Sequence, residues 1–81
     1  MTKQDIKIKM KKFISRHTKE EISDDYNFFT AGLIGSLAAV EMISFIEHEF
    51  KVTVGNDDLD LANFNSLNAI AEFVTRKQNE N

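Results

Sequence analysis

The chain of 81 residues contains no cysteine and no proline. Without cysteine it forms no disulfide, presents no thiolate to a metal and has no thiol nucleophile of its own. That composition is compatible with a reducing compartment. Repeats, low-complexity tracts and linkers are absent as well, so residues 1–81 are predicted to form a single domain, near the small end of what folds alone.

Long apolar runs are also missing. The first ten residues, MTKQDIKIKM, alternate in character and lack the continuous apolar stretch that a signal peptide or a membrane span requires. We therefore expect a cytoplasmic protein without a membrane partner. The start at Met1 and the polar last residues favour a free-standing protein, in which residues 76–81 form a frayed tail.

Charge is divided unevenly along the chain. Residues 1–19 hold seven Lys or Arg and one acid, for a net charge of +6, whereas residues 20–81 hold three Lys or Arg and twelve acids, for −9. The acidic remainder argues against a nucleic-acid domain, although a basic-armed DNA binder with salt-dependent affinity stays open as an alternative. Acidic surface beyond residue 40 favours basic protein partners.

Hydrophobic periodicity predicts an amphipathic helix over roughly residues 3–17, followed by a long loop. The loop, residues 18–35, loses that period and collects Ser, Asp, Asn, Thr and Gly. Thr18 and Glu21 match a capping box, which predicts one short helical turn there. Four apolar residues are expected to pin the loop to the core: Ile22, Phe28, Phe29 and Leu33.

The second half of the chain adds two helices and one short helix. The first helix spans Ser36 to Phe50 and carries an apolar stripe of Ala39, Met42, Ile43, Ile46 and Phe50. Residues 51–54 are expected to be extended, Gly55-Asn56 to turn, and residues 57–62 to form the short helix. The last helix begins near Asn65 or Ser66 and buries Leu67, Ile70, Phe73 and Val74. The predicted fold is therefore all-α, a small bundle of three main helices plus one short helix.

The face opposite the apolar stripe of residues 36–50 is not uniformly polar. Leu37 and Val40 lie on it beside Glu41 and close to Glu47. An apolar pair rimmed by acids is what a docking surface for a basic partner would look like. The alternative is that the long loop simply covers the pair.

Ser36 stands where the loop meets this helix. The plain interpretation is a helix N-cap, a position that Ser favours. A phosphoryl group on Ser36 would, however, lie at a helix N-terminus, where free N–H groups and the helix dipole favour an anion. Gly32 and Gly35 would leave the approach uncrowded.

The stretch FFTAGLIGSLAAVEMISFIEHEF, residues 28–50, resembles the signature of acyl carrier proteins. That signature is a Gly-Leu-Asp-Ser-Leu type motif that opens the second helix, followed by an acidic Glu-x-Glu-Phe end. The pairs Asp58-Leu59, Asn63-Phe64, Ser66-Leu67 and Ala69-Ile70 also resemble the later helices of the family. The likeness covers nearly the whole chain in order and spacing.

The resemblance implies that Ser36 is the attachment serine for 4'-phosphopantetheine, taken from coenzyme A by a phosphopantetheinyl transferase. The arm would carry acyl groups as thioesters, and the chain would be the substrate and partner of enzymes without being an enzyme itself. Leu37, Val40, Glu41 and Glu47 would face the loading, tailoring and acyltransferase or ketosynthase-type enzymes. Asp57, Asp58 and Asp60 would extend that face. We expect a monomer, because a shuttle must release its partners.

One position departs from the family pattern, since Gly35 stands where Asp usually precedes the serine. That Asp helps a transferase to recognise its target, so the change bears on which transferase acts. The whole pattern looks most like discrete carriers of polyketide or hybrid polyketide–nonribosomal peptide pathways, as in antibiotic biosynthesis, that present an extender or starter unit. A fatty-acid synthesis carrier and an unmodified helical interaction domain are the alternatives.

Other chemistry is poorly supported by the sequence. His17 and His48 are 31 residues apart with no cysteine to join them, so no metal site is expected. Asp24-Asp25 lacks the ligand spacing of a calcium loop. No His or carboxylate is placed to activate Ser36 as a catalytic nucleophile, and the G-x-S-x-G motif is absent.

Overall fold

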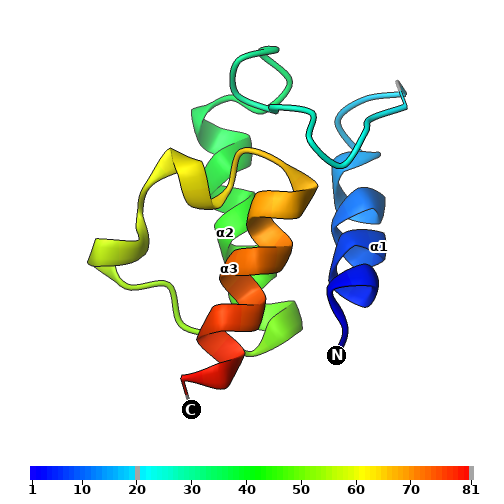
Figure 1. Cartoon of the computed structure of the whole chain (residues 1–81). Helices are drawn as coiled ribbons and strands as arrows, with labels where there is room; N and C mark the ends of the chain where they lie inside the picture. Colours follow the sequence, from blue (N-terminus) through cyan, green and yellow to red (C-terminus); the bar gives the residue numbers. More distant parts are fainter. Residues whose placement is uncertain (20, 81) are drawn as a thin grey trace.

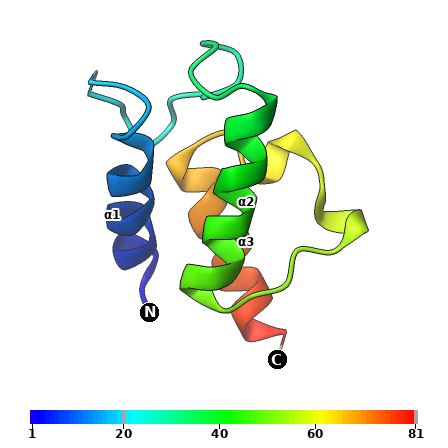
Figure 2. The same ribbon diagram turned by 180° about the vertical axis from the view of Figure 1, so that it is seen from behind.

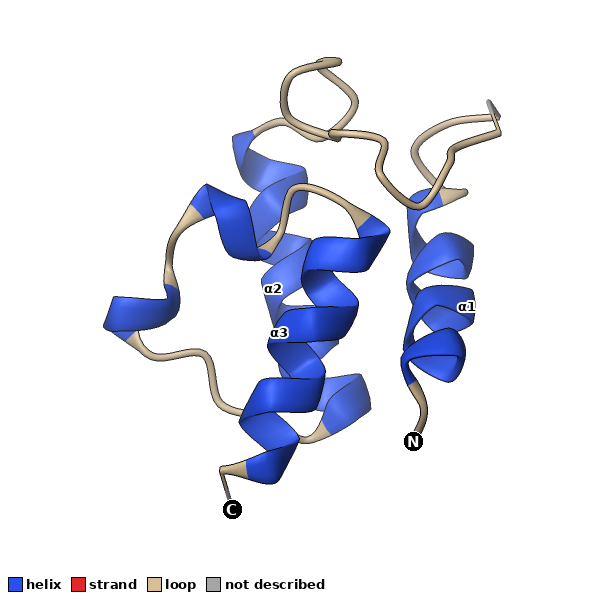
Figure 3. Ribbon diagram, in the orientation of Figure 1, coloured by secondary structure: helices blue, strands red, loops and turns tan. Residues whose placement is uncertain are grey.

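The computed structural model describes residues 1–19 and 21–80. Three α-helices make up the bundle: α1 (Lys3–Ile14), α2 (Ser36–Phe50) and α3 (Leu67–Asn79). Two short 3-10 turns, Asn56–Asp58 and Leu61–Asn63, lie between α2 and α3. Figure 3 shows helices and loops only, and the described residues form no strand. The predicted all-α class is confirmed.

The helices run side by side, with α1 antiparallel to α2 and α3 (Figures 1 and 2). The long first loop crosses one end of the bundle, from the end of α1 to the start of α2 (Figure 1). The first part of the segment 51–66 loops out on the side of the molecule opposite to α1, and its last part crosses back over the bundle to the start of α3 (Figures 1 and 2). The start of α2 therefore lies at the loop end of the bundle, away from both chain termini (Figure 1).

A single apolar core joins the helices. Each helix supplies a buried stripe, and α1 packs chiefly on α3. The predicted stripe of α3 is buried, and Met42, Ile46 and Phe50 of α2 are buried as expected, whereas Ala39 and Ile43 are only half-buried. Phe13 of α1 stacks on Phe45 of α2 with ring centroids 4.8 Å apart.

The loop is pinned to the core much as predicted, but its predicted helical turn is wrong. Ile22 and Phe28 are buried, and Phe29 and Leu33 are half-buried against the core. Ile34 is a further buried contact that the loop composition did not reveal. The described residues around Thr18 and Glu21 are not helical; Glu20 lies outside the described residues. A capping box forms at the start of α1, between Thr2 and Asp5.

Three further predictions need correction. The first helix ends at Ile14 and not at residue 17, because the last turn tightens: Arg16 and His17 donate to carbonyls only three residues back. The short helix predicted over residues 57–62 is replaced by the two 3-10 turns. Residues 76–79, which the sequence places in the polar tail, form the last turn of α3; Asn81 lies outside the described residues.

No helix within residues 1–19 and 21–80 combines the length and the apolar character needed to cross a membrane.

Candidate functional site

Ser36 is the first residue of α2, and Gly35 occupies the N-cap position. Gly35 has φ −88° and ψ −175°, and its carbonyl oxygen accepts the N–H of Ala39 at 2.8 Å, which starts the helix. The plain interpretation of Ser36 as the N-cap is therefore wrong. Its side chain is not needed to close the helix, and Ser36 is exposed.

The loop reaches this point through a tight turn built by Asn27. The Asn27 side-chain oxygen accepts the N–H groups of Phe29 at 3.0 Å and of Thr30 at 2.9 Å. A short polar side chain that bonds to the backbone just ahead of it is a common way to fix such a turn. Gly32 then adopts φ +72°, a left-handed conformation that glycine accepts without strain.

Phe28 holds the same turn to the rest of the fold. Its N–H donates to the Asn65 carbonyl oxygen at 2.8 Å, just before α3 begins. Its own carbonyl oxygen accepts the N–H of Leu33 at 2.9 Å and of Ile34 at 3.3 Å. Because its ring is fully buried as well, Phe28 fixes the segment that leads directly into Ser36.

The start of α2 is open to an anionic substituent. A Cβ added at Gly32 or at Gly35 would meet no heavy atom within 4 Å. The first turn of α2 contains no acid, and its N-cap makes no side-chain hydrogen bond. The N–H groups and the positive end of the helix dipole therefore favour a phosphate on the Ser36 hydroxyl. The residues present fit a phosphodiester at this position.

The predicted docking pair is exposed. Leu37 is 77% exposed and Val40 is 62% exposed, so the alternative in which the long loop covers them is wrong. Glu41 is exposed on the same helix. The structure thus presents an apolar pair with an acid beside it, immediately after Ser36.

The other predicted acids are placed differently from one another. Asp57 is exposed, in the first 3-10 turn. Glu47 is half-buried, and its carboxylate accepts the N–H of Val54 at 2.9 Å. Asp58 turns inward, where its Oδ2 accepts both the Gly55 N–H and the Lys77 ammonium at 3.0 Å. Glu47 and Asp58 thus each support the chain after α2 in addition to any role toward a partner.

These contacts shift the pKa of the carboxylate and of its partner in opposite directions. The Gly55 N–H, followed by the Lys77 ammonium, holds the pKa of Asp58 below its usual value. The same carboxylate raises the pKa of Lys77. Both side chains are about one-fifth exposed, at 22% for Asp58 and 20% for Lys77.

An apolar cavity of about 150 Å³ lies between α2 and the segment that follows it. Its lining residues are Phe29, Ala39, Met42, Ile43, Leu59, Asp60, Leu61 and Phe64. Leu59 and Leu61 are also 57% and 64% exposed, so the surface apolar residues extend beyond Leu37 and Val40. Sequence reasoning missed both leucines because it placed them on a short helix, although the alternation Asp58-Leu59-Asp60-Leu61 argues against a helical period.

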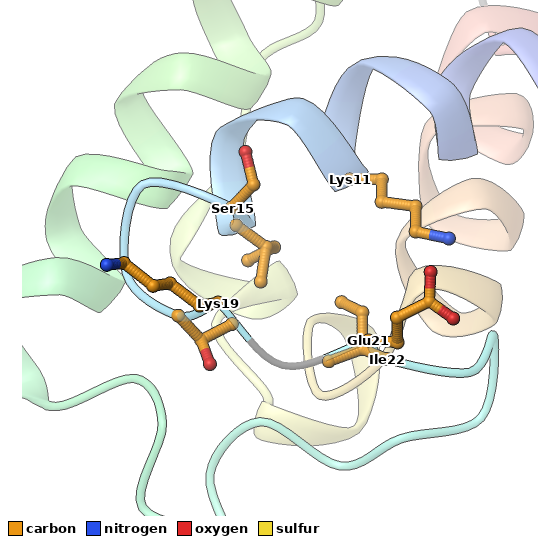
Figure 4. A pocket seen from close by; sticks show the side chains of 7 residues that line it. Lys11, Ser15, Lys19, Glu21 and Ile22 are labelled. Carbon is orange, nitrogen blue, oxygen red and sulfur yellow. The ribbon is translucent and has the colours of Figure 1, made fainter.

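A separate hollow of about 390 Å³ lies between the end of α1 and the loop (Figure 4). Lys11, Ser15, Lys19, Glu21 and Ile22 are among its lining residues, and none comes from α2. Within the described part of the chain, no group of three or more His, Asp or Glu side chains is arranged to hold a metal ion.

Comparison with known families agrees with the geometry at the start of α2. The family model described as a phosphopantetheine attachment site matches residues 6–74. The chain belongs to this phosphopantetheine attachment family. The match includes all of α2 and most of α1 and α3, so the prosthetic group of the protein is covalently bound phosphopantetheine.

Curated relatives of the chain include D-alanyl carrier proteins of streptococci. The one from Streptococcus mutans is 34% identical over 77 residues, which cover 93% of this chain and 98% of the relative. The one from Streptococcus sanguinis is 32% identical over 77 residues, with the same coverage. The one from Streptococcus uberis is 36% identical over 62 residues, 74% of this chain and 78% of the relative.

These findings establish a carrier protein that acts with a phosphopantetheinyl transferase and with acyl-handling enzymes. They confirm the expected family and cofactor. They give no support to the finer expectation of a polyketide or nonribosomal peptide pathway, because these relatives are named as carriers of D-alanyl groups.

Proposed function

We propose that Ser36 bears the phosphopantetheine and that the chain carries an aminoacyl group, D-alanyl or a similar small one, as a thioester. The observation that supports the attachment site best is an exposed serine at the uncapped, acid-free first turn of α2. The names of the relatives support the cargo class.

The arm supplies the thiol that the chain itself lacks, since the sequence contains no cysteine. The chain contributes the attachment hydroxyl and a helix N-terminus that stabilises the negative charge of the phosphodiester. Gly32 and Gly35 keep the approach to that hydroxyl free of side chains. The chain needs no catalytic group for this role, because the transferase and the loading enzyme provide the chemistry.

The partner face comprises Leu37, Val40 and Glu41 on α2, with Asp57 on the segment that follows. The two exposed apolar side chains would enter a shallow apolar site on an enzyme, and the acids would pair with basic side chains at its rim. Glu47 and Asp58 belong to the predicted face as well, but each also makes a contact within the chain: Glu47 accepts the Val54 N–H, and Asp58 pairs with Lys77.

A loading experiment tests the cargo. The holo protein is incubated with D-alanine, ATP and a D-alanine-activating enzyme, and in parallel with malonyl coenzyme A and a polyketide malonyltransferase; the Ser36→Ala variant is the control. We expect a hydroxylamine-sensitive mass increase with D-alanine that is absent from the variant. Loading with malonyl alone would contradict the aminoacyl assignment and favour the polyketide or fatty-acid alternatives.

A further inference from the structure

Residues 55–63, named here the strap, cover the apolar cavity beside α2 without being anchored by a buried side chain of their own. The chain is buried at Val52 before the strap and at Phe64 after it. Every residue from 55 to 63 is exposed or half-buried. In Figures 1 and 2 this segment lies on the side of the molecule opposite to α1; its first turn projects outward, and its second turn, Leu61–Asn63, contacts α3. Hydrophobic burial therefore contributes little to holding the strap in place.

Polar contacts hold it instead, and they converge on Asp58. Its Oδ2 accepts the Gly55 N–H at the start of the strap and pairs with Lys77 Nζ on α3, each at 3.0 Å. Its carbonyl oxygen accepts Asn63 Nδ2 at 2.9 Å, near the end of the strap. A second link to α3, from Arg76 Nη2 to Asn63 Oδ1, is long at 3.5 Å. Among the polar contacts that join the strap to a helix in the described residues, the Asp58–Lys77 ion pair is the short one.

The cavity lies under this segment. Leu59 and Leu61 of the strap form one wall, and Met42 and Ile43 of α2 belong to the rest of the lining. Both leucines are more than half exposed, so moving them outward uncovers little additional apolar surface of their own. Met42 and Phe64 of the lining also belong to the shared core, but the buried core residues of α1 and α3 lie outside the lining, so the helices need not move.

We propose that Lys77 is a positioning residue: through Asp58 it latches the strap over the apolar cavity, and release of this one ion pair opens the cavity while the helices stay folded. The inference does not require Ser36 to be modified. Asp57 lies on the strap as well, so the latch also sets the place of Asp57 on the partner face; that second consequence rests on the proposed function.

Amide hydrogen exchange on the full-length chain tests the latch. The amides of Gly55, Asp58, Leu59, Ala62 and Asn63 report on the strap, because each donates to an acceptor inside it. In Lys77→Met these amides should exchange about fivefold faster, as expected for loss of one partly covered ion pair, while α1 and α3 amides are unchanged. Lys77→Arg, which keeps the charge, should restore the wild-type rates.

The matched control is Lys3→Met. It also removes one cation, together with the ion pair Lys3–Glu72, but that pair joins α1 to α3. This variant should leave exchange in the strap at the wild-type rate. Lys77 pairs with Asp58 and also, at 3.5 Å, with Glu80 at the end of its own helix, which lies outside the strap. Asp58→Asn should accelerate exchange in the strap as Lys77→Met does, and the double variant should accelerate it no further, because both variants break the Asp58–Lys77 pair.

Three results would overturn the proposal: unchanged strap exchange in Lys77→Met, equal acceleration throughout the chain, or the same strap acceleration in Lys3→Met. None of them depends on whether Ser36 accepts phosphopantetheine, so failure of the latch and failure of the proposed function are distinguishable.

Discussion

Replacing Phe28 by Ala should destabilise the protein more than any change on the partner face, because Phe28 joins the long loop to the core. Its ring is 0% exposed, and its backbone connects the loop to Asn65, just before α3. Truncating a fully buried Phe to Ala removes its transfer free energy and leaves a cavity, for a loss of about 3–5 kcal/mol.

That loss is large for a chain of this length, whose free energy of unfolding is expected to be roughly 4–12 kcal/mol. Since 1 kcal/mol lowers the melting temperature of such a domain by about 4–8 °C, Phe28→Ala should melt at least ~12 °C below the wild type or be unfolded at room temperature. Phe28→Leu, which keeps most of the volume, should cost less than about 1.5 kcal/mol and preserve a folded protein for comparison.

Thermal unfolding followed by far-UV circular dichroism measures these shifts. Leu37→Ala is the control, because Leu37 is 77% exposed and its truncation should change stability by less than about 0.5 kcal/mol. A melting temperature of Phe28→Ala within a few degrees of the wild type, or an equal fall in Leu37→Ala, would refute the assignment of Phe28 as the anchor of the loop.

Three further outcomes are expected. Leu37→Ala should lower kcat/KM for a loading enzyme by about tenfold with little effect on stability, because an exposed apolar side chain acts in docking and not in folding. An unchanged kcat/KM in steady-state assays would exclude Leu37 from the partner face. Gly35→Asp should raise the free energy of unfolding by a few tenths of a kcal/mol in a chemical denaturation curve, because the new Cβ meets open space and the carboxylate can cap α2. The same variant should be modified faster by a transferase that recognises an Asp before the serine. Slower modification would show that Gly35 is itself recognised. The melting temperature should fall as pH drops below about 4, because folding lowers the pKa values of four carboxyl groups: Asp5, Glu49, Asp58 and Glu72. The stability that these groups contribute is present above their ordinary pKa and is lost as they are protonated in the folded protein. A melting temperature independent of pH between about 2 and 5 would contradict this.

The helices could be predicted from the sequence because each one buries a stripe with the helical period. Ile6 and Ile14 of α1, Met42 and Ile46 of α2, and Ile70 of α3 are all fully or almost fully buried. Burial of such a stripe decides the secondary structure over a dozen residues or more, so the periodicity was sufficient. The same argument placed Leu37 and Val40 on the opposite face of α2, but it left open whether the long loop covers them; the structure shows both exposed.

The ends of the helices depend on contacts that periodicity does not encode. The Ser15 hydroxyl donates to the Lys12 carbonyl oxygen at 2.7 Å, where α1 gives way to a tighter turn. At α2 the cap is Gly35, so Ser36 moves one position into the helix. The side chain of Ser15 bonds to the backbone at the end of its helix, whereas Ser36 does not serve as the cap of its helix. The presence of a serine therefore does not by itself predict where a helix begins or ends.

The segment between α2 and α3 could not be predicted because its contacts are remote in the chain. Asp58 pairs with Lys77, 19 residues later, and this contact accompanies 3-10 turns, in which Asp58, Leu59 and Asn63 donate their N–H groups to carbonyls three residues back. Likewise Lys9 pairs with Glu49, 40 residues away. Ser36 could be singled out from the sequence as the proposed attachment serine only through the family resemblance, because an exposed serine at a helix start is common.

The central claim is that Ser36 bears the phosphopantetheine, and intact mass spectrometry tests it most directly. The apo protein is incubated with coenzyme A, magnesium and a broad-specificity phosphopantetheinyl transferase, beside Ser36→Ala and the matched variant Ser44→Ala, which alters another exposed serine of α2. We predict a gain of one phosphopantetheinyl group in the wild type and in Ser44→Ala, and none in Ser36→Ala. No gain in the wild type with several transferases, or a gain that persists in Ser36→Ala, would contradict the account.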